Sequence, residues 1–174
     1  MRVAGLYKND MIDGLGFCVS LWTQGCPHHC LQCHNPETWP FNGGQEIHIN
    51  KLEEEIIEAL NANGVERNFS ILGGEPLCEE NLYDITGIVK DVRKKYPNIK
   101  IFVWTGYTYE ELLKQNNIVI KQLFEAIDVL IDGRFELDKR DVTLWLRGSK
   151  NQRVIDMKKT LESGKVCEYI NPYS

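Results

Sequence analysis

Three cysteines near the start of the chain have a spacing that could bring their thiolates around one centre. Cys26, Cys30 and Cys33 follow the pattern C-x3-C-x2-C, and a glycine precedes the first of them. Pro27 and the polar residues between the cysteines favour a loop, which can turn several side chains toward one point. Thiolates select zinc, copper(I) or iron–sulfur clusters. A [4Fe–4S] cube held only by protein takes four cysteines, so three would leave one iron free to bind another ligand.

Two other chemistries compete for the same cysteines. A structural zinc site of the Cys3His type could take its fourth ligand from His28, His29 or His34. However, no second ligand pair with the usual zinc spacing follows later in the chain. A disulfide framework suits small secreted proteins, whereas this chain has 174 residues and shows no signal peptide. The spacing therefore favours a cluster over zinc, and either metal centre over disulfides.

A second motif, Gly73-Gly74-Glu75-Pro76, follows the cysteine loop, and the combination resembles the radical S-adenosylmethionine (SAM) enzymes. Residues 25–39 (GCPHHCLQCHNPETW), 129–135 (VLIDGRF) and 147–153 (RGSKNQR) resemble one branch of that superfamily. This branch contains the activating enzymes of the anaerobic (class III) ribonucleotide reductase. The similarity extends from about residue 14 to about residue 156.

The resemblance implies a specific reaction and a protein partner. In the superfamily, a reduced [4Fe–4S] cluster passes an electron to the sulfonium of SAM, and cleavage of a C–S bond gives a 5′-deoxyadenosyl radical. In the activase branch, this radical removes a hydrogen atom from a glycine of the large reductase subunit and leaves a glycyl radical there. The resemblance therefore implies an oxidoreductase with a cluster and SAM as cofactors. It also implies the reductase large subunit as protein substrate and an electron donor such as flavodoxin.

The Gly-Gly-Glu-Pro motif would give the expected cofactor a second anchor. The carboxylate of Glu75 and the exposed carbonyls at Gly73 and Gly74 could accept hydrogen bonds from the methionine ammonium group. Glycines also let the backbone approach a ligand closely. Taken alone, the motif is more typical of a turn between a strand and a helix. Its place after the cysteine motif favours the binding role.

Further cofactor contacts are expected beside the cluster and at the ends of strands. Gln32 and His34 flank Cys33 and would lie beside the adenine, contacting it mainly through backbone atoms. Many members of the superfamily carry an aromatic residue where this chain has Gln32, so the resemblance is weaker there. Thr105 and Asp132 follow predicted strands and could bind the ribose hydroxyls or the amino group. Both could equally be ordinary cap or turn residues.

Three arginines are expected near the same edge of the fold. Arg134, Arg147 and Arg153 could hold the carboxylate of the cofactor or an acidic surface of a partner. For any single one of them, a solvated charge is the simpler interpretation.

Hydrophobic periodicity predicts strands that alternate with helices. Strands are expected at residues 17–23, 69–72, 99–104, 129–131, 143–146 and 153–155. Helices are expected from residue 50 to the Asn63-Gly64 stop, and at residues 80–95, 109–115, 119–127 and 157–163. Asn50 with Glu53, and Thr108 with Glu111, have the spacing of capping boxes. Residues 1–16 are expected to form an entry segment with a turn at residues 13–16, and residues 34–49 a long irregular connection.

This alternation requires parallel βαβ units, which bind ligands at the carboxyl ends of their strands. The candidate motifs each follow a predicted strand, so they should meet at one edge of the sheet. With fewer than eight strands, the sheet should stay open. The expected fold is α/β, with a mostly parallel sheet and outer helices. As the resemblance also implies, this is an open partial (βα) barrel of the radical SAM type, in a single domain over residues 1–174.

Composition narrows the range of functions. The net charge of −5 argues against a broad nucleic-acid surface, which would normally be basic. No apolar run approaches the roughly 20 residues of a membrane span. We therefore expect a cytoplasmic protein with reduced thiols and no membrane partner. In such a protein, Cys18, Cys78 and Cys167 are most simply buried small hydrophobic residues.

Two alternatives to the activase function follow from the sequence. The same radical chemistry could serve another glycyl-radical enzyme of the pyruvate formate-lyase type, or a small-molecule substrate as in the 7-deazaguanine synthases. A zinc-stabilised binding module without catalysis belongs to a different class, and it would contain zinc and no iron.

Overall fold

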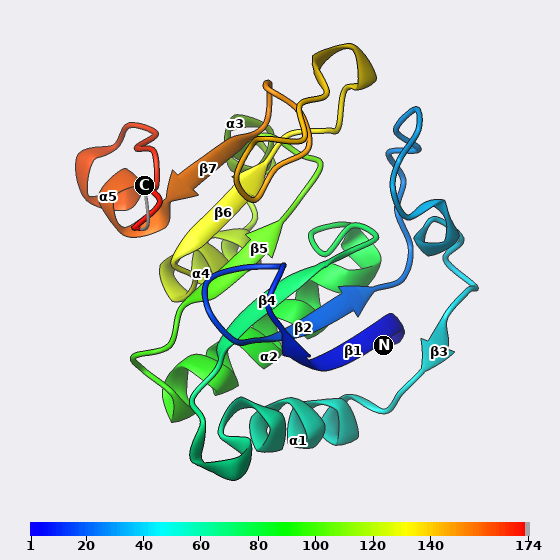
Figure 1. Cartoon of the computed structure of the whole chain (residues 1–174), viewed down its shortest axis with the longest axis vertical. Helices are drawn as coiled ribbons and strands as arrows, with labels where there is room; N and C mark the ends of the chain where they lie inside the picture. The colour runs from blue at the N-terminus through cyan, green and yellow to red at the C-terminus, as the bar shows by residue number, and fades with distance from the viewer. Residues whose placement is uncertain (173–174) are drawn as a thin grey trace.

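A computed structural model describes residues 1–172, so the last two residues of the expected 1–174 domain lie outside the described residues. The strands form one seven-stranded sheet in the order β3-β1-β2-β4-β5-β6-β7 (Figure 1). The strands are β1 (Arg2–Asp10), β2 (Cys18–Thr23), β3 (Gln45–Glu46), β4 (Asn68–Gly73), β5 (Ile101–Trp104), β6 (Val129–Asp132) and β7 (Arg153–Asp156). The helices are α1 (Ile49–Leu60), α2 (Glu79–Lys95), α3 (Tyr109–Lys114), α4 (Ile118–Ala126) and α5 (Met157–Ser163).

The centre of the sheet is parallel, and both of its edges are antiparallel. β2, β4, β5 and β6 pair in parallel. The connections between them contain α1, then α2, then α3 and α4, as parallel pairing requires. β1 and β3 extend one edge, and β7 extends the other, each by antiparallel pairing. The predicted α/β class with a parallel core is therefore confirmed.

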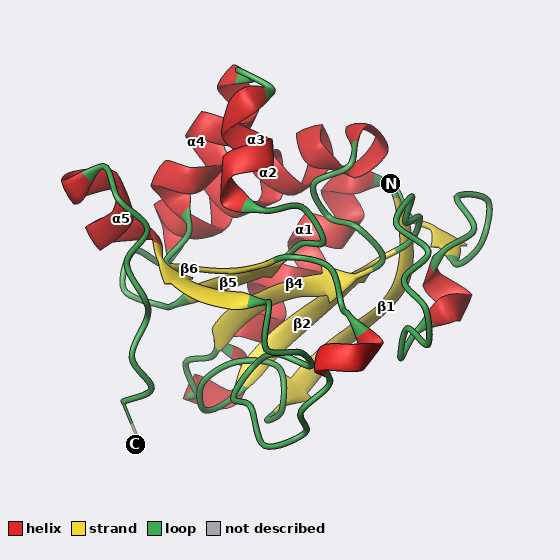
Figure 2. Cartoon of the chain, turned by 90° about the horizontal axis from the view of Figure 1, so that it is seen from above, coloured by secondary structure: helices red, strands yellow, loops and turns green. Residues whose placement is uncertain are grey.

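Helices cover one face of the sheet, and long loops cover the other (Figure 2). On the helix side, Ile71, Val103 and Leu130 belong to the main core, together with apolar residues of α1, α2 and α4. On the loop side, Phe102 and Ile131 belong to a second, smaller core. Successive side chains of a strand point to opposite faces. The parallel strands are therefore apolar on both faces, as is usual for a sheet buried on both sides.

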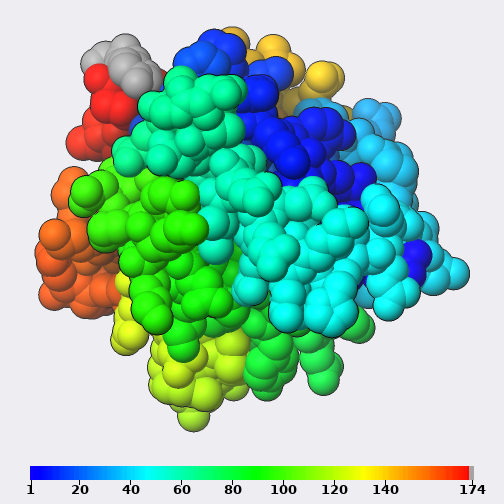
Figure 3. Space-filling view, turned by 90° about the horizontal axis from the view of Figure 1, so that it is seen from below, coloured from blue at the N-terminus to red at the C-terminus, as the bar shows by residue number. Residues whose placement is uncertain are grey.

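The surface seen from below is formed largely by α1 in cyan and α2 in green (Figure 3). α1 buries Leu52, Ile56 and Leu60, and α2 buries Leu82 and Val89, in each case at helical spacing. This spacing confirms the hydrophobic periodicity from which both helices are predicted. Among the described residues, none of the helices combines the length and the apolarity that a membrane crossing requires.

One predicted capping box is confirmed and the other is wrong. Thr108 accepts a hydrogen bond from Glu111 N (3.2 Å), and the Glu111 carboxylate accepts one from Thr108 N (2.7 Å). The predicted box of Asn50 and Glu53 does not form, because α1 begins earlier and its N-cap is His48, whose side chain makes no cap bond. Asn50 therefore lies inside the first helical turn, where its side chain is not placed to cap that turn.

Three other segments differ from the prediction. β1 occupies residues 2–10 of the predicted entry segment, where no strand is expected, and the short β3 lies within residues 34–49, which are predicted to be irregular. The strand predicted at residues 143–146 is absent. Those residues lie in the turn-rich connection between β6 and β7, and Leu146 has a φ of 59°, which a strand does not allow. The other predicted helices and strands are confirmed to within two residues at either end.

Candidate cluster and cofactor site

A cavity of about 590 Å3 opens at the carboxyl ends of the parallel strands. Its volume lies in the range of about 300–1,000 Å3 that is typical of small-molecule sites. The loop that follows each of the four parallel strands contributes to its lining. These loops contain the cysteine motif, the Gly-Gly-Glu motif, residues 105–106 and residues 133–135. Sequence motifs that are up to about a hundred residues apart therefore meet at the predicted edge of the sheet.

The three cysteines of the motif all line this cavity. The start of their loop is fixed where Cys26 N donates a hydrogen bond to the carbonyl of Trp39 (3.0 Å). Further along, His29 and Gln32 adopt left-handed backbone angles, with φ values of 48° and 55°. Such residues reverse the chain sharply. The loop thus curls back on itself and keeps the thiols of the motif at the cavity.

Burial favours the neutral thiol form of two of these cysteines in the protein alone. It raises the pKa of Cys26 to about 11 and also raises the pKa of Cys30. Iron binds thiolates, and a bound metal deprotonates a coordinating thiol. Within residues 1–172, no group of three or more His, Cys, Asp or Glu side chains is arranged to hold a metal ion. The thiols would therefore release protons, and turn toward the irons, as a cluster is bound.

The other three cysteines lie outside the cavity lining. Cys18 and Cys78 are buried, as predicted for small hydrophobic residues. Cys167 is only half-buried, so the same prediction is wrong for that residue. All six cysteines carry free thiols. The disulfide framework considered from the sequence is therefore absent among the described residues.

The two glycines of the second motif allow close contact between the cysteine loop and the end of β4. A Cβ atom on Gly73 would lie 2.7 Å from the backbone nitrogen of Thr23, and one on Gly74 would lie 2.4 Å from the carbonyl oxygen of Gly25. Gly73 also has a φ of 99°, which side chains rarely permit. Both glycines line the cavity. Because the two glycines lack side chains, their backbone forms part of the cavity wall, and the start of the cysteine loop can pack directly against it.

The carboxylate of Glu75 is fully buried and saturated by protein donors. Its Oε1 accepts hydrogen bonds from Leu77 N (2.9 Å) and Thr105 Oγ1 (2.7 Å). Its Oε2 accepts from Gly106 N (2.7 Å) and His28 Nε2 (2.8 Å). A carboxylate has about four acceptor sites. Protein donors therefore fill the acceptor sites with which this carboxylate was expected to bind the methionine ammonium group.

Thr105 lines the cavity, but its hydroxyl group is already in use. Besides donating to Glu75, the hydroxyl oxygen accepts a hydrogen bond from Tyr107 N (3.2 Å). Thr105 thus stiffens its own turn, which is the structural alternative considered from the sequence.

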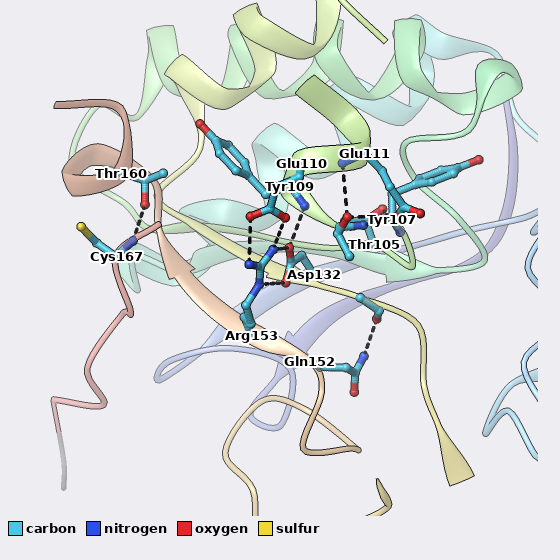
Figure 4. A network of polar contacts seen from close by, with 12 residues as sticks. Thr105, Tyr107, Tyr109, Glu110, Glu111, Asp132, Gln152, Arg153, Thr160 and Cys167 are labelled. Carbon is cyan, nitrogen blue, oxygen red and sulfur yellow. Dashed lines mark hydrogen bonds and ion pairs between the residues drawn. The ribbon is translucent and has the colours of Figure 1, made fainter. Parts of the chain in front are cut away.

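Asp132, which was expected to face the cofactor, lies outside the cavity lining. Its carboxylate accepts hydrogen bonds from Arg153 Nε (2.9 Å) and from Tyr109 N (2.7 Å), as Figure 4 shows. Arg153 also donates to Glu110 from Nη1 (3.0 Å) and Nη2 (2.7 Å). This pairing with Arg153 lowers the pKa of Glu110. Asp132 and Arg153 therefore connect β6, β7 and the start of α3. The next residue after Asp132, Gly133, lines the cavity instead.

The two residues expected beside the adenine have different positions. His34 lines the cavity, and its ring packs on Phe135 with 5.4 Å between the ring centroids. Gln32 is exposed and does not belong to the lining. His34 therefore belongs to the wall of the candidate cofactor cavity, whereas Gln32 does not.

Several cavity residues were not identified from the sequence. Trp22 and Trp104 line the wall near the ends of β2 and β5. Each follows a residue of the helix-side core, Leu21 or Val103, so strand alternation places it on the loop side. Asp13 also lines the cavity, and burial, with a smaller effect of the nearby Asp10, raises its pKa to about 7. Periodicity could have identified the tryptophans, whereas nothing in the sequence pattern distinguishes Asp13.

Comparison with known proteins places this site in a family. Residues 12–155 match a family model described as the 4Fe-4S single cluster domain. The chain is 38% identical over 155 residues to the anaerobic ribonucleoside-triphosphate reductase-activating protein of Salmonella typhimurium, covering 88% of this chain and 97% of that protein. It is 39% identical over 149 residues to the protein of the same name from Escherichia coli K12, covering 85% and 94%. The corresponding protein of phage T4 is 34% identical over 156 residues, covering 88% and 93%. The chain belongs to the family of anaerobic ribonucleoside-triphosphate reductase-activating proteins.

Membership of this activating-protein family bears on the chemistries that the cysteine spacing left open. The matched region begins before the cysteine loop and ends within β7, so it contains every loop that lines the cavity. Its description is that of a 4Fe–4S domain rather than a zinc domain. The resemblance to the activase branch is thus confirmed, and the zinc module receives no support.

Proposed function

We propose that this protein binds a [4Fe–4S] cluster through Cys26, Cys30 and Cys33, cleaves SAM reductively, and generates a glycyl radical on anaerobic ribonucleoside-triphosphate reductase. The strongest support is that these three cysteines line the same strand-end cavity as the Gly-Gly motif. The printed names of the relatives support the choice of the reductase as target. We further propose that the sheet is the open partial (βα) barrel of the radical SAM type, formed by a single domain.

The chemistry of the cavity lining fits both cofactors. Three cysteines line it, so a cube would retain one iron for the amino and carboxylate groups of SAM. Trp22, Trp104 and Phe135 give the wall an apolar, aromatic character that suits an adenosyl group. When bound, the reduced cluster and SAM supply a 5′-deoxyadenosyl radical that removes a hydrogen atom from a glycine of the partner.

Backbone atoms are the best candidates to bind the ammonium group of SAM. Glu75 is saturated, so the acceptors would be carbonyl groups of the Gly73-Gly74 segment, which lines the cavity. The role of Glu75 is then to hold that segment and its neighbours in place.

Three cationic side chains line the cavity and suit an anionic group. Arg134, Arg140 and Arg147 belong to the lining, and in the described part of the chain none of them forms an ion pair with a carboxylate. Arg147 donates to the carbonyl of Gln152 (2.7 Å), and its Nε is buried without a partner. Because the whole chain has a net charge of −5, this local positive charge is distinctive. We propose that it attracts the carboxylate of SAM or an acidic group of the reductase.

The mouth of the cavity suits a protein substrate. Ile12 and Val142 both belong to the lining, yet they are 83% and 78% exposed. Exposed aliphatic side chains at the rim of a polar site are suited to contact with a protein surface. We propose that a loop of the reductase enters here, that a cytoplasmic electron donor such as flavodoxin reduces the cluster, and that the protein acts in the cytoplasm.

The function is tested with anaerobically reconstituted protein, a reductant, SAM and the reductase. We expect about four irons per chain, formation of 5′-deoxyadenosine, and a glycyl-radical doublet in the electron paramagnetic resonance (EPR) spectrum. Cys30→Ser should lose the iron and the doublet. Cys167→Ser should retain both, because this half-buried cysteine lies outside the cavity lining.

Other outcomes would identify the error. Cofactor cleavage without a doublet would contradict the assignment of the reductase and favour a pyruvate formate-lyase type partner or a small-molecule substrate. Zinc without iron after anaerobic purification would overturn the cluster assignment altogether.

A further inference from the structure

A buried histidine lies in the middle of the cysteine loop. His28 is two residues from Cys26 and two from Cys30, and its side chain is only 4% exposed. Its Nε2 donates a hydrogen bond of 2.8 Å to Oε2 of Glu75, which is fully buried. Because a carboxylate only accepts, the proton of this bond must lie on Nε2. The adjacent His29 differs, since its side chain is exposed and makes no contact with Glu75. It contacts the carbonyl of Pro27 (3.1 Å) and packs edge-on against Trp39, with 4.9 Å between the ring centroids.

The loop after β5 forms a fitted seat for the His28 ring. Tyr107 packs edge-on against it, with 4.5 Å between the ring centroids and an interplanar angle of 72°. In addition, a Cβ atom on Gly106 would lie 2.3 Å from Cδ2 of His28. Glycine is therefore required at position 106 to make room for the imidazole.

Glu75 connects this ring to the rest of the cavity wall. Its other donors are Leu77 N, Thr105 Oγ1 and Gly106 N, which come from the loops after β4 and β5. The bond from His28 adds the cysteine loop, which follows β2, to the same carboxylate. One buried carboxylate thus joins three of the four loops that line the cavity.

We propose that His28 is a positioning residue, which fixes the cluster-binding loop against the Gly-Gly-Glu segment by donating a hydrogen bond to Glu75. The inference rests on the proposed function, because it concerns the geometry of the cluster and of the cofactor beside it. Residues that orient metal ligands commonly change metal affinity or activity by about 10–100-fold when they are replaced. His28 holds the loop itself, so its loss should loosen the cluster and shift it relative to the segment that binds the cofactor.

Four variants of the full chain separate the hydrogen bond from the packing. His28→Phe keeps a ring and loses the donor. His28→Gln places an amide nitrogen near the former Nε2 position and keeps a donor. Gly106→Ala displaces the imidazole but leaves the amino-acid sequence of the cysteine loop unaltered. His29→Gln is the matched control, because it makes the same chemical change at an exposed neighbour.

Cluster binding and cluster geometry are then measured separately from turnover. Each variant is reconstituted anaerobically, and circular dichroism checks that it is folded. Three quantities are recorded: the rate of iron release to a chelator, the midpoint potential of the cluster, and the change that SAM causes in the EPR spectrum of the reduced cluster. We expect iron release to be about 10–100-fold faster in His28→Phe and in Gly106→Ala, with a weakened response to SAM. His28→Gln should restore most of both properties, and His29→Gln should match the parent protein.

Two results would overturn the proposal. The first is a His28→Phe protein with the iron-release rate, potential and SAM response of the parent. The second is equal damage in His28→Phe and His28→Gln, which would assign the effect to ring packing rather than to the hydrogen bond. Failure of the proposed function looks different, because the parent protein itself would then bind no cluster or leave SAM intact.

Discussion

Two buried carboxylates at the same edge of the sheet have contrasting roles. Glu75 follows β4 and Asp132 ends β6, and they are 0% and 1% exposed. Glu75 takes four hydrogen bonds from histidine, hydroxyl and amide donors, and it lines the cavity. Asp132 is neutralised by the guanidinium of Arg153 and lies behind the cavity wall. Glu75 joins loops that form the candidate cofactor site. Asp132 joins β7 and the start of α3 to the end of β6.

The difference shows why a carboxylate after a parallel strand is a poor guide to ligand binding. Both residues were expected to face the cofactor, and both instead satisfy backbone and side-chain donors of the protein. Loops that meet at the carboxyl edge of a sheet leave amide groups without strand partners, and buried donors must be satisfied. The longer side chain of Glu75 reaches the donors of two neighbouring loops, whereas Asp132 reaches a backbone amide and a cation.

The strongest test of the comparison is Glu75→Ala. It leaves the donors of His28, Thr105 and two backbone amides buried without an acceptor. Removal of one partner from a buried polar cluster of this kind costs about 3–5 kcal/mol. We expect a loss of that size in the free energy of unfolding of the cluster-free protein, measured by urea denaturation. Glu75→Gln, which keeps one carbonyl acceptor, should cost about 1–3 kcal/mol. If Glu75→Ala is as stable as the parent, Glu75 does not join the loops.

The second test is Asp132→Asn, which should cost less and leave the cluster in place. The amide oxygen can still accept from Tyr109 N, and Arg153 retains Glu110 and remains partly exposed. We expect a loss of about 1–3 kcal/mol in the free energy of unfolding, since a charge-assisted bond is replaced. The iron content after reconstitution should equal that of the parent. Loss of iron together with stability would show that Asp132 and Glu75 share one role, contrary to the comparison.

Much of the fold could be predicted because the parallel strands are apolar runs and the helices have apolar stripes. β1 could not, since its sequence RVAGLYKND mixes charged residues with glycine and it lies toward an edge that only the two-residue β3 extends. The opposite error at residues 143–146 has a related cause. Trp145 and Leu146 are apolar because they pack onto the loop-side core, not because they pair with a strand. An apolar run in a sequence indicates that its side chains are buried, but it does not show whether its backbone pairs with another strand.

The site could be predicted as far as local spacing allows. The cysteine motif and the glycine motif identified two of its loops, since both depend on a few neighbouring residues. The roles of Glu75 and Asp132 could not be predicted, because their partners lie up to 47 residues away and only the fold brings them together. His28 appeared in the sequence only as a possible zinc ligand. Its seat on Gly106 becomes visible only when the loops after β2 and β5 are placed side by side.

The carboxyl group of Asp13 differs from those of Glu75 and Asp132, because no hydrogen-bond donor within residues 1–172 stabilises its charged form. Asp13 lines the cavity, and burial, together with the neighbouring Asp10, raises its pKa from 3.8 to about 7. The folded protein therefore holds this proton more tightly than the unfolded chain. The stabilisation is fully present below pH 3.8 and is lost as the pH rises toward about 7.

Asp13→Asn should remove this pH dependence. Relative to the variant, the parent should lose stability between about pH 4 and pH 7, by on the order of 1 kcal/mol after allowance for solvent screening. The measurement is urea unfolding of both proteins at several pH values. Asp138→Asn, at an exposed aspartate, is the matched control and should follow the parent. Parallel stability curves for Asp13→Asn and the parent would contradict the assignment.

The smallest effect is expected at Glu110, the exposed carboxylate that shares Arg153 with the buried Asp132. Glu110 is 51% exposed and pairs with Arg153 at 2.7 Å. This pairing, mainly a hydrogen bond, lowers the pKa of Glu110 below 4.5, so its stabilisation is present above that pH and is lost in more acidic solution. Glu110→Gln should therefore cost about 0.2–1 kcal/mol at pH 7, and less at high salt. Urea unfolding at two salt concentrations measures this, with the unpaired surface residue Glu162 as the site of the control substitution Glu162→Gln. A loss as large as that of Asp132→Asn would mean that Arg153 depends on its exposed partner as much as on its buried one. The buried pair would then not be the part of the network that secures β7 to the sheet.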